Sequence, residues 1–546
     1  MKKIILYFII NSVCTTLTIG QVSFEDFSNR NIYAILDELA NEKIISLNSS
    51  NKPYTRDKIY KLLKKAKKNK NLKNQLLRKE INIYLKNYEF FFNKDVDKNI
   101  KLNRKKFEFS YKKKNSFFIL KPIWGINYKT KKNETFEHYY GGLSSEAQVN
   151  KNWFFYANLR DNTLSEPIAM PSYYRQEIGG NYKLWRENDF SEMQGGVIHS
   201  FKSGHIALIK EHIQWGDNYF GSNIFSGRTP SFPMIKLYVK ITDRVELNYL
   251  HAWLISEVVD SSRSYISSAG YLRGIYRQKN LAANLISVKF YNNTYFSFGN
   301  SIIYSDLGGI HPAYLIPFLF YKSVDHTLNH NIENQNSQIF LNFSCREIKH
   351  CHIYSSLFID EFKKSRVFTD SLNNFLSLKI GTKVSNWPIP NISNILEINY
   401  SSPMTYQHYV EGTTFESNQY NLGHYMRDNS KTINYQLSYK LPKRINLIFD
   451  YLYAMHGDDI EYSFLNEFDP TSIPIRQNKT WDFESYQFSI TKEFKDNIYL
   501  SLIYEITNSK GYDTENYSAE YYLNKFTPEF YRGKNKILSM NLNIGF

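Results

Sequence analysis

Apolar and polar residues alternate strictly at the end of the chain. The last ten residues, ILSMNLNIGF (537–546), carry an apolar side chain at every second position from Leu538 to Phe546. In a β-strand this period of two produces one apolar face and one polar face. Chain termini fray unless something pairs with them, so we expect this strand to be held at both edges.

The same alternation recurs after about residue 106. Between Leu376 and Ser385, leucine, isoleucine and valine alternate with serine, lysine and glycine, and a similar pattern runs from Ile498 to Thr507. An apolar face of this kind can meet lipid while the polar face lines a wet interior.

Short turns and long polar segments follow one another along this part of the chain. Tight hairpins are predicted at Ser203-Gly204, Thr242-Asp243, Asn292-Asn293, Ile348, Pro442 and Lys495-Asp496, and long segments at 215–233, 256–280, 306–336, 403–429, 456–483 and 508–533. This arrangement is typical of an outer-membrane barrel and not of a Greek-key sandwich. We therefore predict a mainly β fold, a large antiparallel transmembrane β-barrel of about 18 strands over residues 106–546, closed by pairing of the last strand with the first.

The region before the barrel has helical periodicity. Apolar residues follow helical spacing from Ile32 to Leu39, Thr55 is placed to cap a second helix, and a third pattern runs from Leu72 to Tyr84. We predict a small helical domain over residues 21–105. Residues 1–20 have the charged start, apolar core and small-residue end of a secretory signal peptide, although Cys14 leaves a lipoprotein signal as an alternative.

Positive charge is concentrated in this helical region. Residues 21–115 carry 24 Lys and Arg against 11 Asp and Glu, which accounts for most of the formal net charge of +16. The basic run KLLKKAKKNKNLK (61–73) is either a solvated helix face or a contact surface for anionic lipid headgroups or an acidic polymer. A secreted chain is not expected to bind nucleic acid.

Catalytic signatures are not found in the sequence. GxSxG, HExxH, P-loop and EF-hand motifs do not occur, so neither an enzyme nor a cofactor is predicted. A cluster of carboxylates, Asp458, Asp459 and Glu461, lies in a predicted external loop. We interpret it as a solvated loop, with calcium binding or acid–base chemistry as alternatives.

Aromatic and polar residues are interleaved in QWGDNYFGSNIFSG (214–227), ahead of a nearby arginine. Aromatic rings can stack on sugar rings, while carboxylate, amide and guanidinium groups bind hydroxyls and charged substituents. The candidates for polysaccharide binding here are Trp215, Asp217, Asn218, Tyr219, Phe220, Asn223 and Arg228. The alternative is that Trp215 belongs to the aromatic girdle of the barrel and that the glycines only shape a loop folding into the lumen. Weaker candidates are His311, Tyr314, Tyr321 and Asp360.

Two cysteines flank a predicted turn. Cys345 and Cys351 are symmetric about Ile348 in CREIKHC, and residues placed symmetrically about a hairpin turn face each other across the strands. We predict a disulfide, with free thiols or a metal site using His350 or His352 as alternatives.

Several longer stretches resemble a known family. They are YAILDELANEKIISLNSSNKPYTR (33–56), QWGDNYFGSNIFSGRTPSFPMIKL (214–237), HPAYLIPFLFYKS (311–323), LFIDEF (357–362), PMTYQHY (403–409) and YNLGHYMRDNS (420–430). Their order and spacing resemble the Bacteroidetes-type members of the Wzi family of capsule assembly proteins. This resemblance implies an 18-stranded outer-membrane barrel with a helical periplasmic part that acts as a lectin for capsular polysaccharide.

The function predicted from these observations is non-enzymatic. We expect a barrel in the cell outer membrane that anchors capsular or surface polysaccharide, with the helical domain in the periplasm and the long loops outside. The expected partners are that polysaccharide, outer-membrane lipids and lipopolysaccharide, and the barrel assembly machinery. The alternative is a porin-like channel or a substrate-specific transporter.

Overall fold

The computed structural model describes residues 23–26, 29–92, 99–103, 108–183, 186–328, 334–362, 364, 374–460, 478–495 and 498–545. The predicted signal peptide and Phe546 lie outside these ranges.

Eighteen antiparallel strands form a closed barrel. The first nine are β4 (Ser116–Lys131), β5 (Glu134–Val149), β6 (Trp153–Leu164), β8 (Arg186–Phe201), β9 (Gly204–Glu211), β11 (Phe232–Lys240), β12 (Val245–Leu254), β15 (Lys279–Lys289) and β16 (Thr294–Ser305). The others are β17 (Gln335–Cys345), β18 (Cys351–Glu361), β19 (Phe375–Ser385), β20 (Ile392–Ser401), β23 (Ser430–Leu441), β24 (Ile445–His456), β25 (Trp481–Lys495), β26 (Ile498–Gly511) and β27 (Lys534–Ile544). The predicted mainly β fold and its large antiparallel barrel are confirmed.

The last strand is held at both edges, and its closing partner is the first of the eighteen strands, as predicted. β27 pairs with β26 on one edge and with β4 on the other, from Leu538 opposite Thr130 to Ile544 opposite Trp124. The first half of β4 pairs instead with β3 (Glu108–Lys113), which pairs with β2 (Asn99–Asn103). The expectation that the last strand closes the barrel by pairing with the first is therefore confirmed, and the long strand β4 serves both partners in succession.

The two faces of the wall have different chemistry. In β19, Leu378 and Ile380 are exposed on the outside, while Lys379 is fully buried on the inside and pairs with Glu397 of β20 at 2.7 Å. Apolar residues outside and polar residues inside are the pattern of a membrane-spanning barrel. Among the described residues, no helix is long and apolar enough to cross a membrane.

The two ends of the barrel differ in their connections. One end, here called the short-turn end, carries tight turns such as 202–203 and 442–444, and the other, the long-loop end, carries segments such as 255–278 and 402–429. The short strands in the connections are β1 (Asn51–Lys52), β7 (Tyr182–Lys183), β10 (Gln214–Trp215), β13 (Tyr265–Ile266), β14 (Leu272–Arg273), β21 (Glu416–Ser417) and β22 (Tyr420–Asn421). The helices of the loops are α5 (Tyr321–Leu328), α6 (Ala519–Phe526) and the 3₁₀ turns η1 (Pro312–Leu315), η3 (Glu411–Thr413) and η6 (Glu529–Tyr531).

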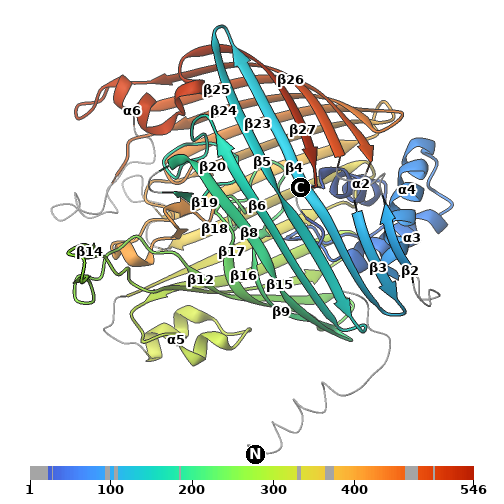
Figure 1. Ribbon diagram of the computed structural model, residues 1–546, viewed down its shortest axis with the longest axis horizontal. Coiled ribbons are helices and arrows are strands. Elements are labelled where there is room, and N and C mark those ends of the chain that lie inside the picture. Colours follow the sequence, from blue (N-terminus) through green and yellow to red (C-terminus); the bar gives the residue numbers. More distant parts are fainter. Residues whose placement is uncertain are drawn as a thin grey trace, which may run out of the picture.

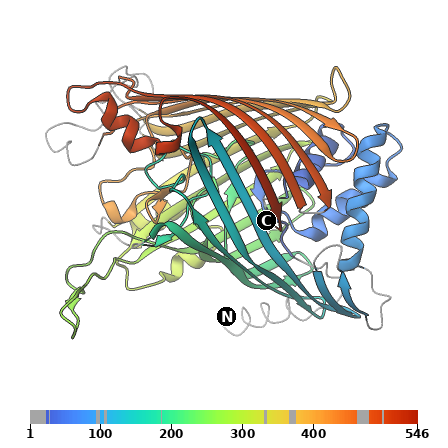
Figure 2. The same ribbon diagram turned by 45° about the horizontal axis from the view of Figure 1, so that its top comes forward.

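Three α-helices precede the barrel and share one apolar core. They are α2 (Arg30–Asn41), α3 (Arg56–Lys68) and α4 (Gln75–Phe92). The predicted cap is present, because the Thr55 side chain accepts a hydrogen bond from the Lys58 backbone N–H at 3.2 Å. These helices lie at the short-turn end, opposite α6 and β14 (Figures 1 and 2).

The helical segment is attached to the barrel through buried charges. Arg346, in the turn between β17 and β18, donates hydrogen bonds to Asp37 at 3.1 Å and to the Asn41 side chain at 3.0 Å. Burial opposes the charge of Arg346, but Tyr219 and Asp37 raise its pKa above its usual value. A second anchor joins Lys440, in β23, to Glu38 at 2.5 Å.

Arg346→Met is predicted to weaken this attachment. The substitution removes the charge that pairs with the buried Asp37, and breaking a buried ion pair costs about 3–5 kcal/mol. Thermal unfolding should begin at a lower temperature, and limited proteolysis should cut the helical segment while the barrel strands resist. Lys349→Gln is the matched control, because Lys349 lies in the same turn with its side chain 61% exposed. Equal behaviour of the two variants would contradict the prediction.

Candidate functional site

The predicted sugar-binding segment lies inside the barrel and is buried. Trp215 is 0% exposed and packs edge-to-face against Phe225 and against Phe340 of β17, with ring centroids 5.2 and 6.1 Å apart. Its strand β10 pairs with β1, so Trp215 lies opposite Asn51 of the helical segment. The ring lies inside the barrel, so its assignment to the membrane girdle is wrong, whereas the alternative that this segment is a loop folded into the lumen agrees with the structure.

The neighbouring polar candidates connect the segment to the wall. Asp217 accepts hydrogen bonds from Ser49 and, at 2.7 Å, from Asn342 of β17. The Tyr219 backbone N–H donates to Glu397 of β20 at 2.9 Å. Asn218 donates to the Gly216 carbonyl at 2.7 Å, and Phe220 is half-buried. These side chains therefore hold loop 212–231 inside the lumen and do not form an open site.

Arg228 joins three loops that fold inward from the long-loop end. Its guanidinium donates to the carbonyls of Met170 at 3.2 Å and Tyr173 at 2.7 Å and lies over the Tyr420 ring. Burial lowers the pKa of Arg228 to about 10. Its Nε and Nη1 find no hydrogen-bond partner among the described residues. Arg228 therefore links its own loop to the loop of Met170 and Tyr173 and to the loop of Tyr420.

Two further candidates anchor the inward loops to the wall. Asn223 donates to the backbone carbonyls of Ser356 at 3.2 Å and Ser377 at 2.8 Å. Asp360 of β18 accepts a hydrogen bond from the Tyr406 backbone N–H at 2.7 Å. Together they join loops 212–231 and 402–429 to strands β18 and β19.

The candidates in HPAYLIPFLFYKS lie elsewhere. Tyr314 and Tyr321 are fully buried, but they pack with Tyr249 and Tyr304 in a separate cluster against strands β12, β15 and β16. His311 lies beside Tyr314, with ring centroids 5.0 Å apart. These residues share no contact surface with Trp215, so the structure does not bring the two predicted groups into one site.

The acidic loop does not form a metal centre in the part of the chain that the structure describes. No group of three metal-ligating side chains comes together there, and Glu461 lies outside that part. Asp459 instead pairs with Lys525 of α6 at 2.6 Å, and the Asp458 carbonyl accepts a hydrogen bond from Asn429.

The cysteines are not opposite each other. The register of the hairpin pairs Cys345 with Ile353, while Cys351 pairs with Val384 on its other side, and both thiols are free. The centre of the turn lies one residue beyond Ile348, which displaces the two cysteines along the strands. The prediction of directly opposed cysteines joined by a disulfide is wrong for this reason.

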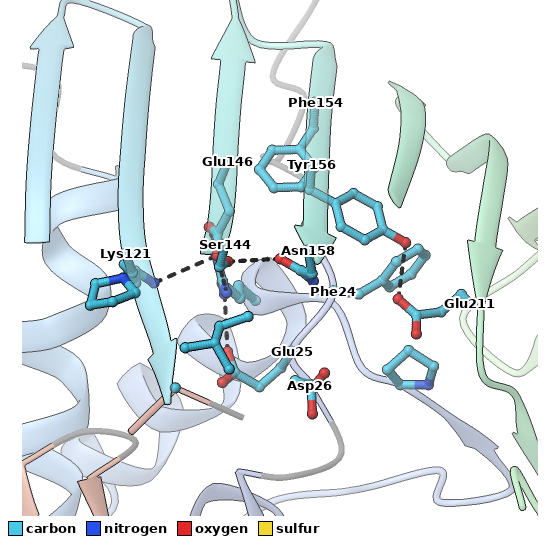
Figure 3. A pocket seen from close by; sticks show the side chains of 15 residues that line it. Phe24, Glu25, Asp26, Lys121, Ser144, Glu146, Phe154, Tyr156, Asn158 and Glu211 are labelled. Atoms are coloured by element: carbon cyan, nitrogen blue, oxygen red, sulfur yellow. Dashed lines mark hydrogen bonds and ion pairs between the residues drawn. The ribbon is translucent and has the colours of Figure 1, made fainter. Parts of the chain in front are cut away.

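A small cavity of about 70 Å³ lies between the helical segment and the wall (Figure 3). Its charged groups largely pair with one another. Arg56 contacts Glu146 and, at 3.0 Å, Glu25, and Tyr156 donates to Glu211 at 3.0 Å. Burial opposes the charge of Arg56, but the two carboxylates raise its pKa above its usual value. The cavity therefore belongs to the junction between the helical segment and the barrel wall. Because its charged groups are already paired, it is a poor site for a ligand.

An exposed aromatic and basic surface lies at the long-loop end, on loop 255–278. The short hairpin of β13 and β14 projects from the barrel in Figure 2. Tyr265 and Tyr271 are 57% and 68% exposed, and Arg263 is also exposed. Further exposed members of this surface, here called the hairpin surface, are Arg273, Tyr276 and Arg277. Sequence reasoning missed it, although the loop sequence SSRSYISSAGYLRGIYRQ (261–278) combines tyrosine and arginine repeatedly.

Free thiols predict a simple labelling result. In the denatured and unreduced protein, both Cys345 and Cys351 should react with an alkylating reagent, because neither is joined to the other. Mass spectrometry of the labelled peptides measures this, with a reduced sample as the control. Labelling that appears only after reduction would contradict the register of the hairpin.

Comparison with known proteins identifies a shared fold. No protein-family model and no curated protein sequence matches the chain. Among solved structures, the chain is similar to Wzi of Escherichia coli, described as a carbohydrate-binding β-barrel involved in group 1 capsule assembly. The TM-score is 0.59 at 10% identity, and the match covers 96% of this chain and 100% of that protein.

Weaker likeness extends to porin structures. OccAB2 of Acinetobacter baumannii matches with a TM-score of 0.42 at 9% identity, covering 79% of this chain and 97% of that protein. OccD3 (OpdP) of Pseudomonas aeruginosa also has a TM-score of 0.42 at 9% identity, covering 78% and 90%. The match to Wzi confirms the likeness predicted from the sequence, and it shows that this chain and Wzi share a fold.

Proposed function

We propose that this protein is a non-enzymatic outer-membrane barrel that binds and anchors capsular or surface polysaccharide at the cell surface. The observation that carries the proposal is the pairing of two segments inside the lumen, which makes the barrel a scaffold for its loops. The shared fold with a protein described as a carbohydrate-binding barrel supports the same function.

Segments of the chain enter the lumen from both ends. Loop 212–231 enters from the long-loop end, and residues 46–52 of the helical segment enter from the short-turn end. The two meet where β10 pairs with β1, and Asn51 is also hydrogen-bonded to Asn248 of the wall. A transporter needs a path through this region, whereas a binding protein needs only a rigid support.

The hairpin surface has the chemistry for an acidic or neutral glycan. Exposed tyrosine rings can stack on the CH faces of sugars, and arginine can bind hydroxyls or carboxylates with a planar fork of donors. A second exposed aromatic pair lies at the same end, where Tyr517 and Tyr521 stack with centroids 4.2 Å apart. Polysaccharide would thus contact the loops and not the buried Trp215.

This function requires a defined orientation. In outer-membrane barrels the short turns are periplasmic and the long loops are external. We place the helical segment in the periplasm and the hairpin surface outside the cell. Lipopolysaccharide and other outer-membrane lipids then surround the wall, and assembly would use the barrel assembly machinery.

The paired segments inside the lumen predict an electrically silent protein. Residues 46–52 and loop 212–231 are here called the plug. The intact protein inserted in a planar lipid bilayer should give no steady current, because the plug remains joined to the wall by buried hydrogen bonds. A porin of similar diameter measured in the same bilayer is the positive control. Stepwise and stable conductance of the intact protein would favour the alternative, a channel or transporter.

Loss of the tyrosine rings should weaken glycan binding. Tyr265→Ala combined with Tyr271→Ala is predicted to lower affinity for the purified surface polysaccharide about tenfold, since each stacking ring contributes about 0.5–1.5 kcal/mol. Calorimetry measures the affinity, and immunoblotting measures barrel abundance. Tyr291→Ala is the control, because Tyr291 is 72% exposed but lies at the short-turn end. Unchanged affinity in the double variant would contradict the role of the hairpin surface.

A further inference from the structure

One loop of the long-loop end folds over the outside of the barrel wall. Residues 306–328, here called the outer-wall segment, contain η1 and α5, and α5 contacts β16 and β17 (Figure 1). Loops 212–231 and 402–429, and the loop that contains Met170 and Tyr173, instead fold into the lumen. This segment is therefore placed on the face that a membrane barrel presents to lipid.

The alternation of β16 identifies this face. Ser297 and Ser301 face the lumen, where their hydroxyls hydrogen-bond to Ser287 and Gln338 at 2.8 and 2.7 Å. Phe298 and Asn300 therefore point outward. Phe298 is 42% exposed, whereas Asn300, toward the long-loop end, is only 9% exposed because the outer-wall segment covers it.

Two asparagines on the outer face bind the backbone of the segment. The side chain of Asn284, in β15, donates to the Leu319 carbonyl at 2.9 Å. The Asn300 side chain accepts a hydrogen bond from the Tyr321 N–H at 2.9 Å and donates to Asn284 at 2.9 Å. Without the segment, both amides would face hydrocarbon near the middle of their strands, where an unsatisfied polar group costs several kcal/mol.

Tyrosines of the wall and of the segment satisfy further backbone groups. Tyr249 of β12 donates its hydroxyl to the Tyr314 carbonyl at 2.8 Å. The His311 N–H donates to the Tyr304 hydroxyl at 3.3 Å, and the Tyr321 hydroxyl donates to the Ile316 carbonyl at 3.3 Å. Irregular backbone is tolerated at membrane depth only where protein groups satisfy it, and the wall supplies those groups here.

The opposite side of the segment is apolar and exposed. Phe318 is 68% exposed, Phe320 45% and Leu315 42%. This surface continues the exposed apolar face of the same wall, where Phe298 and Phe343 point outward. Continuity with the outward band of the barrel indicates lipid as the occupant, because that band faces acyl chains.

We propose that the outer-wall segment is a re-entrant loop immersed in the outer leaflet, where Phe318, Phe320 and Leu315 contact the acyl chains of the surrounding lipid. The wall asparagines supply the hydrogen bonds that let the segment leave water. The inference rests on the proposed membrane location of the barrel and does not depend on glycan binding.

Site-directed spin labelling tests the immersion. In a cysteine-free background (Cys14→Ser, Cys345→Ser, Cys351→Ser), Phe318→Cys carries a nitroxide, and the protein is reconstituted in phospholipid nanodiscs. Collisions with apolar O₂ relative to a water-soluble nickel chelate report the environment of the label. We expect the O₂-to-nickel ratio at Phe318 to be several-fold higher than at Leu272→Cys, since Leu272 is 75% exposed on the projecting hairpin.

A third label separates this inference from the membrane location itself. Phe298→Cys lies on the lipid-facing wall and should give a ratio similar to that of Phe318. A lipid-like ratio at Phe298 with a water-like ratio at Phe318 would overturn the re-entrant loop alone. A water-like ratio at Phe298 would overturn the membrane location as well. Low access of both reagents at Phe318 would indicate a protein cover and would also overturn the proposal.

Replacing an asparagine tests the mechanism. With the Phe318 label in place, Asn300→Leu should release the segment and lower the O₂-to-nickel ratio several-fold toward the value at Leu272. A bare lipid-facing wall tolerates leucine at this position, so the barrel itself should still fold, which heat-modifiable migration in gels would verify. A ratio that stays lipid-like in a folded variant would show that the asparagine does not hold the segment.

Discussion

The structure depends on one constraint, the need to pair backbone N–H and C=O groups wherever water is absent. Barrel closure satisfies this constraint for the strands. From Leu538 to Ile544, β27 pairs with β26 on one edge and with β4 on the other, so this stretch has no free edge. The same constraint explains Asn284 and Asn300 on the outer face, which bind the irregular backbone of the outer-wall segment. These two outward-facing asparagines therefore supply hydrogen bonds to the backbone that lies against the wall.

Inside the barrel the corresponding problem is the burial of charge. A lumen of this width cannot be filled by wall side chains alone, so the helical segment and the inward loops occupy it. Buried charges there are stabilised by partners of opposite charge, as Arg346 is by Asp37 and Lys379 is by Glu397. The pairing of β1 with β10 joins the two parts of this plug. A barrel filled in this way leaves its loops as the accessible surface.

The same combination of aromatic and polar residues has three different roles in this chain. Around Trp215 it forms the interior of the plug, around Tyr321 it covers the outer wall, and around Tyr265 it is exposed at the long-loop end. These environments differ in solvent access, and solvent access decides whether a ring is available to stack on a sugar. Composition alone does not distinguish them, so the likeness to a carbohydrate-binding barrel does not transfer to individual residues.

Local pattern by itself determined the existence and approximate places of the strands, turns and helices, and the Thr55 cap, because periodicity and capping depend on residues close together in the chain. Only the tertiary structure decided the division of β4 between β3 and β27, the displacement of Cys345 from Cys351, and the destinations of the long loops. Register shifts move side chains by whole residues without changing the alternation that identifies a strand. A loop's direction depends on contacts with strands far away in sequence, such as Asp217 with Asn342 and Asn284 with Leu319, and no local pattern records those contacts.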